Sequence, residues 1–215
     1  MKSLNKTLFI FFILFISLAY IESAIVVYLR EIYYPNGFHF PIKIIENRIA
    51  FIEIGREVFT IIILWFSAML TADKFKKRFA FFLYNFGLWD IFYYLWLKVL
   101  IDWPAGWLEW DILFLIPLPW IAPWLAPVLI SIGFIVCSYI LLKRSDRFKN
   151  KIFNKIEWLL EIVAASVILW SFFWQTKHVL NGGVPDYYPW WLFIFGIILG
   201  LGVFINRYKK PISEN

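Results

Sequence analysis

The sequence predicts an all-α integral membrane protein: a six-transmembrane-helix bundle with a short Trp/Pro-rich interfacial or re-entrant segment between the third and fourth helices. Hydrophobic residues make up 62% of its 215 residues, and the mean hydropathy is +0.72. A soluble domain is nearer half apolar, and a core this small cannot bury such an excess. Long apolar runs, and basic residues that alternate between the connections, complete the prediction.

Six apolar runs form a single polytopic domain over 1–215. Each of the first five is long enough to cross a bilayer, whose hydrocarbon core takes about 20 helical residues. The sixth is shorter but almost purely apolar. The runs do not alternate with period two, and backbone in lipid must satisfy its own hydrogen bonds, so we expect helices. The predicted spans are 7–29, 49–70, 79–101, 121–142, 156–174 and 190–205.

The first run has one feature of a signal peptide, since Lys2 and Lys6 precede it. No small-x-small cleavage site follows, because Glu22 stands where a small residue is needed and the apolar run continues to Leu29. We therefore expect an uncleaved first helix.

Basic residues gather in alternate connections, which predicts the orientation. The positive-inside rule places both termini in the cytoplasm of a bacterial-type inner (plasma) membrane. The basic residues behind the net charge of +6 then indicate topology and contact anionic lipid, and they do not form a nucleic-acid surface. The basic residues on the predicted cytoplasmic side are Lys2, Lys6, Lys74, Lys76, Lys77, Arg78, Lys143, Arg144, Arg147, Lys149, Lys151, Lys155, Arg207, Lys209 and Lys210. The opposite connections hold Arg30, Lys43, Arg48 and Lys177.

The third connection is rich in tryptophan and proline. Tryptophan favours the membrane interface, so we expect a short interfacial or re-entrant helix on the outer face, followed by the fourth span. This Trp/Pro-rich connection is either an aromatic belt that anchors the outer loop or a lid over a site. The residues concerned are Trp103, Pro104, Trp107, Trp110, Pro117, Pro119, Trp120, Pro123, Trp124 and Pro127.

Three charges interrupt the second apolar run, in the stretch FIEIGREVFT. Glu53, Arg56 and Glu57 follow the i, i+3, i+4 spacing that puts side chains on one stripe of a helix. Each charge at the centre of a spanning helix costs about 2.5–3.5 kcal/mol. The stripe must therefore face other helices or water.

Polar partners at a similar depth occur on the first and third helices. Asp90, Tyr94 and Lys98 recur every four residues on the third, and the predicted orientation places them with the second helix's charges in the outer half. We predict one buried ion- or substrate-binding cluster beneath the Trp-rich loop, with Tyr93 and Asn85 nearby. Its residues are Glu22, Glu53, Arg56, Glu57, Asp90, Tyr94 and Lys98. Four acids against two bases require a protonated carboxylate, a bound cation or a water-filled cavity.

The remaining polar residues predict no metal site and no cofactor. Two histidines, His39 and His178, and one cysteine, Cys137, are too few for a tightly held transition metal. Glu157 suits the N-terminus of the fifth helix, whose dipole favours an acid, whereas Glu161 lies deeper. The GxxxG pattern that begins at Gly196 favours close helix packing.

Three functions fit this pattern, and the sequence leaves open whether the protein is an enzyme. The first is cation- or proton-linked transport of a small solute, with the carboxylates as the ion site. A bundle this small would need to form a homo-oligomer. The second is an intramembrane enzyme acting on a lipid or lipid-linked substrate. In it Glu53, Glu57 or Asp90 would be the catalytic base, and Arg56 or Lys98 would hold a phosphate. The third is a membrane scaffold or assembly factor with structural ion pairs. The acid excess favours transport.

Overall fold

The computed structural model describes residues 2–43, 45–144, 148 and 152–210, and it is mainly helical. Arg147, Lys149 and Lys151, three of the basic residues that predict the orientation, lie outside this described part. Six long helices and one five-residue helix, α6, account for most of the described chain. The helices are α1 (Lys2–Tyr33), α2 (Asn47–Met69), α3 (Phe75–Ile101), α4 (Leu125–Lys143), α5 (Lys155–Phe173), α6 (Thr176–Leu180) and α7 (Trp190–Lys209).

Four segments in the described part of the chain are long and apolar enough to cross a membrane. They are α1 from Leu4, α4, the stretch Lys155–Leu180 that joins α5 to α6, and α7. They mark a multi-pass membrane protein. The other two long helices are less apolar, because α2 carries its three central charges and α3 is rich in Tyr and Trp. The sequence therefore predicts six spans, and the apolar character of the helices supports four.

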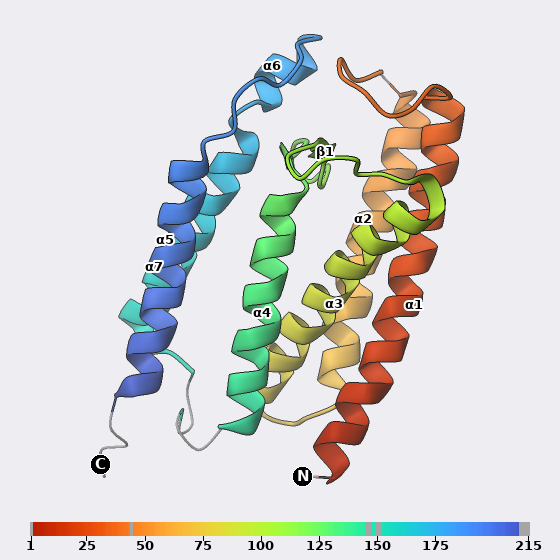
Figure 1. Cartoon of the computed structure of the whole chain (residues 1–215). Helices are drawn as coiled ribbons and strands as arrows, with labels where there is room; N and C mark the ends of the chain where they lie inside the picture. Colours follow the sequence, from red (N-terminus) through yellow and green to blue (C-terminus); the bar gives the residue numbers. More distant parts are fainter. Residues whose placement is uncertain (1, 44, 145–147, 149–151, 211–215) are drawn as a thin grey trace.

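The helices stand side by side, and their ends gather at two levels (Figure 1). The start of α1, the turn from α2 to α3 and the end of α7 lie at one level, and the hairpin and α6 lie at the other. Helix α3 crosses the middle and packs against α1, α2 and α4. Helices α5 and α7 pack mainly on each other, and α7 also touches α4. The basic clusters at the start of α3 and the end of α7 therefore share one end of the bundle.

Large apolar side chains cover the outside of the bundle. Phe51 of α2 is 76% exposed, and Trp170 of α5 and Ile198 of α7 are each 64% exposed. In water such surface would be costly, whereas in a bilayer it is in contact with lipid. The buried apolar core lies between α1, α3 and α4, around Phe15 and Phe81.

The third connection forms a β-hairpin, so the prediction of a short helix there is wrong. Strands β1 (Trp110–Ile112) and β2 (Ile121–Pro123) are antiparallel, with Asp111 opposite Ala122. Two further backbone hydrogen bonds, between Leu113 and Trp120 and between Trp120 and Phe114, extend the pairing toward the tip. Proline has no N–H and disrupts a helix interior, so the two prolines of the tip do not favour a helix. Helix α4 accordingly begins at Leu125, after β2.

Helix α3 meets α4 closely at Gly87. A Cβ atom there would stand 2.7 Å from the carbonyl oxygen of Ser131 and 2.8 Å from Cγ1 of Ile135. Because a backbone carbonyl cannot move away cheaply, we expect Gly87→Ala to lower the free energy of unfolding by about 1–3 kcal/mol. Gly133→Ala is the matched control, since nothing lies within 4 Å of its Cβ position. Thermal unfolding of both variants in detergent is the measurement, and equal melting temperatures would contradict the expectation.

Candidate functional site

The polar stripe of α2 faces into the bundle, as its helical spacing predicts. Glu53, Glu57 and Thr60 are buried on one face, and the apolar Leu64 and Ala68 continue the same face downward. Arg56 lies beside this stripe, with its side chain 20% exposed. The charges interrupt the apolar run because this face meets other protein groups, not lipid.

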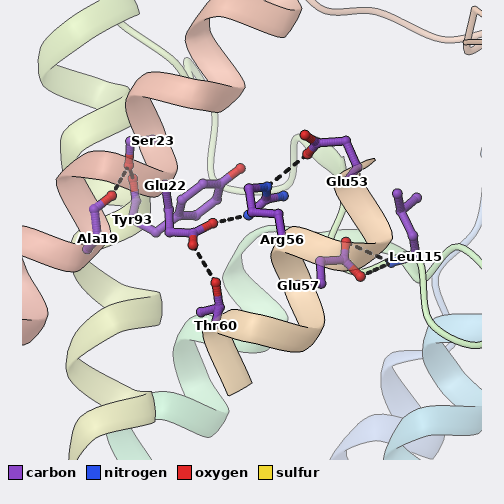
Figure 2. A network of polar contacts seen from close by, with 9 residues as sticks. All are labelled: Ala19, Glu22, Ser23, Glu53, Arg56, Glu57, Thr60, Tyr93 and Leu115. Atoms are coloured by element: carbon purple, nitrogen blue, oxygen red, sulfur yellow. Dashed lines mark hydrogen bonds and ion pairs between the residues drawn. The ribbon is translucent and has the colours of Figure 1, made fainter. Parts of the chain in front are cut away.

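Arg56 joins two carboxylates from different helices, and we name Glu22, Glu53, Arg56 and Thr60 the Arg56 network (Figure 2). The Nε of Arg56 donates to Glu53 at 2.9 Å, and its Nη1 donates to Glu22 of α1. Thr60 donates to the other oxygen of Glu22. Two carboxylates share one guanidinium, so the network carries one formal negative charge in excess when both are ionised.

Glu57 holds the tip of the hairpin. The backbone N–H of Leu115 donates to both of its carboxylate oxygens, at 3.0 and 2.9 Å (Figure 2). The residue is 6% exposed and forms no ion pair among the described residues. A hydrogen bond to an ionised acceptor is stronger than one between neutral groups. The hairpin is thus fastened to α2 through a group whose charge can change.

A second ion pair lies at the hairpin end of the bundle and was not predicted. Arg30 of α1 donates to Asp111 of β1 at 3.1 Å, and the Tyr94 hydroxyl donates to the other oxygen of Asp111 at 3.3 Å. The guanidinium lies 3.8 Å from the centroid of the Trp103 ring and 4.7 Å from that of Phe38. Burial raises the pKa of Asp111, and the positive charge of Arg30 opposes that rise.

A signal for this pair was present in the sequence. Asp111 stands in the otherwise apolar stretch WDILFLI, where a carboxylate needs a donor, and Arg30 lies in the last turn of the first helix. Helix direction predicts the depth of a residue only on a helix, so it could not place Asp111, which lies in β1.

Asp90 is buried where α3 meets α4. It accepts a hydrogen bond from the Ser131 hydroxyl at 2.8 Å, is 6% exposed and has no basic partner among the described ion pairs. Tyr93 and Tyr94 on the next turn are within electrostatic reach of both Asp90 and Asp111. Tyr94 contacts the Arg30–Asp111 pair through its hydrogen bond to Asp111, and Tyr93 is within electrostatic range of both Arg30 and Arg56.

Two residues expected in or near the cluster lie elsewhere. Lys98 pairs with Asp102 at 2.7 Å and donates to the carbonyl of Pro104 at 3.1 Å, with its side chain 48% exposed. Its long stem lets the ammonium group turn toward the end of its own helix. Asn85 donates to Leu64 and Ser67, away from the carboxylates. Lys98 is therefore removed from the buried cluster, and Asn85 is not beside it.

Glu157 has the role expected at a helix start. It forms a capping box with Asn154 and pairs with Lys210 at 2.7 Å. Glu161, one turn deeper, faces α7, because a Cβ at Gly200 would stand 3.2 Å from its Oε2. Gly196 brings α7 against α5 in the close packing that its GxxxG pattern predicts. Among the residues described, no group of three His, Cys, Asp or Glu side chains could hold a metal ion.

Comparisons with protein-family models, with curated proteins and with solved structures find no match to this chain. The chemistry of the site therefore has to indicate the function. Its five buried acids, against two arginines, give an excess of carboxylates in a region of low dielectric. The acids are Glu22, Glu53, Glu57, Asp90 and Asp111.

Proposed function

We propose that this protein is a six-span inner-membrane transport protein that binds a proton or a small cation in the outer half of its α1–α4 bundle. The ion would be linked to the movement of a small solute. Both termini would be cytoplasmic, because the basic residues at the start of α3 and the end of α7 share one end of the bundle. The opposite end, with the hairpin, would then face outward.

The observation that carries this proposal is the contact between Glu57 and Leu115. The hairpin lies across the outer end of the carboxylate region, and a single carboxylate accepts the N–H at its tip. Protonation of Glu57, or a cation bound beside it, weakens its attraction for that N–H. Ion binding and the opening of the outer end would thereby be coupled, as alternating access requires.

The scaffold function explains only part of the site. Arg56 between Glu22 and Glu53 would lock α1 to α2, and a structural role accounts for that contact. It gives no reason for the ionisable character of Glu57 and Asp90, which are buried and form no ion pair in the described part of the chain. Ionisable groups of this kind in a membrane are costly and mark ion pathways.

A pH jump on reconstituted protein tests the transport proposal. With liposomes adsorbed on a sensor electrode, wild-type protein should give a transient current as protons enter the carboxylate region. Glu57→Gln and Asp90→Asn should each reduce that displaced charge measurably, by up to about half, because each removes one of the titratable groups. Lys98→Met should leave it unchanged, since Lys98 lies outside the cluster.

Jumps of Na⁺ or K⁺ at constant pH distinguish a metal cation from a proton as the bound ion. Absence of a current with all three ions would overturn the proposal. A current that both carboxylate variants leave intact would also overturn it, because the charge would then move elsewhere in the molecule.

A further inference from the structure

An aromatic cavity opens at the outer end of the bundle, next to the Arg30–Asp111 pair. Its volume is about 430 Å³, and it lies between the loop after α1 and the turn before β1. The carboxylate region already described does not include it. The side chains that line it and matter here are Phe38, His39, Phe40, Trp103, Glu109 and Trp110.

The aromatic rings that line this cavity stand at steep angles to one another. Phe38 stands at 72° to Phe40 and at 88° to Trp103, with centroids 5.4 and 6.3 Å apart. These rings and that of Trp110 line the same cavity. An ammonium group binds against aromatic rings because each ring face carries partial negative charge.

The wall before β1 is held in place without a ligand. Glu109 accepts the N–H of Ala105 at 2.7 Å, and its carbonyl accepts the N–H of Trp124 at 3.0 Å. The indole of Trp124 donates to the carbonyl of Gly106 at 2.8 Å. A wall already fixed in position lowers the entropy lost when a ligand binds.

The charges around the cavity favour a cation. Two of its rings, Trp103 and Phe38, already contact one cation, the guanidinium of Arg30. Asp111 neutralises that guanidinium at 3.1 Å. Glu109 lines the cavity, and its carboxylate forms no ion pair among the described residues, so one negative charge remains at this wall.

We propose that this cavity binds an organic ammonium group, with Phe38, Phe40 and Trp110 around the cationic head and Glu109 as its counter-charge. The bound group is the head of a small soluble cation or of a zwitterionic lipid, since both present the same chemistry at this level of the membrane. The proposal does not depend on transport, because it concerns binding at equilibrium. A negative pH-jump result would leave it standing.

Binding of radiolabelled choline to the full-length protein in maltoside micelles tests the proposal. We expect saturable binding that tetramethylammonium displaces. The neutral analogue 3,3-dimethylbutanol has the same shape without the charge and should displace choline at least tenfold less well. Phosphatidylcholine added to the micelles should compete if a lipid head is the natural ligand, whereas phosphatidylglycerol should not. Choline binding that neither lipid affects assigns the site to a soluble cation.

Three variants locate the binding. Glu109→Gln keeps an acceptor for the Ala105 N–H but removes the charge, and should weaken choline binding at least fivefold. Phe40→Leu removes one wall and should also weaken it. Trp107→Leu is the matched control, because Trp107 stacks on Trp124 outside the cavity lining and should bind as wild type does. Equal displacement by the neutral analogue, displacement by inorganic phosphate, or absence of saturable binding would each overturn the proposal.

Discussion

Arg30→Met should lower the free energy of unfolding by about 3–5 kcal/mol, the usual cost of leaving one partner of a buried ion pair alone. Asp111 is 3% exposed and would keep only its tyrosine partner among the described side chains. The variant would also lose the contacts of the guanidinium with Trp103 and Phe38, which together contribute roughly 1–2 kcal/mol in a partly desolvated site. Chemical unfolding in detergent measures the difference.

Two comparisons separate charge from packing in this experiment. Lys98→Met removes a basic residue from the same end of the bundle, but its partner is exposed, so the loss should stay below about 1 kcal/mol. Arg30→Met combined with Asp111→Asn removes both charges and should recover more than half of the loss, because neither charge is then left unpaired. If Arg30→Met costs no more than Lys98→Met, the pair is not a buried one in the folded protein.

The positions of the long helices could be predicted because apolar runs and helices coincide in a membrane protein. The second apolar run, predicted at 49–70, lies in the helix Asn47–Met69, and the third, predicted at 79–101, lies in the helix Phe75–Ile101. Hydropathy finds only the apolar part of a helix. Helix α1 therefore continues to Tyr33 and α7 to Lys209, beyond the expected ends at 29 and 205.

The hairpin could not be predicted from local composition. A short, mainly apolar stretch such as the one that contains Trp110–Ile112 is compatible with a strand or with a turn of helix. Eight residues, two of them proline, separate this strand from its partner, and only the pairing of the two decides the structure. The tryptophans predict a segment at the membrane interface, but they carry no information on backbone pairing.

The candidate site was predictable where helix direction fixes depth. Glu22 and Arg56 are far apart in sequence, yet helices running in opposite directions bring them to one level, and they do interact. The same reasoning failed for Lys98, because a long flexible side chain can reach a group off its own level. It could not include Asp111, whose depth depends on the hairpin.

Glu57→Leu should open the outer end of the bundle to water. The lost hydrogen bonds from Leu115 to a charged acceptor amount to about 1.5–3 kcal/mol, which corresponds to a roughly tenfold to hundredfold larger open population. The reporter is Thr60→Cys in a Cys137→Ser background, because Thr60 is 3% exposed and lies about one turn deeper on the same stripe. Its rate of reaction with a membrane-impermeant maleimide in intact cells should rise by that factor. Glu57→Gln keeps one acceptor oxygen, so its labelling rate should fall between those of the wild type and Glu57→Leu.

The controls make the labelling result decisive. Asn181→Cys, in the exposed turn after α6, should react at the same rate in every variant and reports which end of the bundle faces outward. Glu157→Leu also removes a carboxylate that accepts a backbone N–H, but at the opposite end, and should leave the rate at position 60 unchanged. If Glu57→Leu and Glu157→Leu give the same rate, the hairpin is not held by Glu57, and the proposed coupling of ion binding to opening fails. If the labelling rate at position 60 rises in Glu57→Leu but not in Glu157→Leu, water reaches the carboxylates when the Glu57–Leu115 contact is lost. Ion-linked transport through this end requires such access.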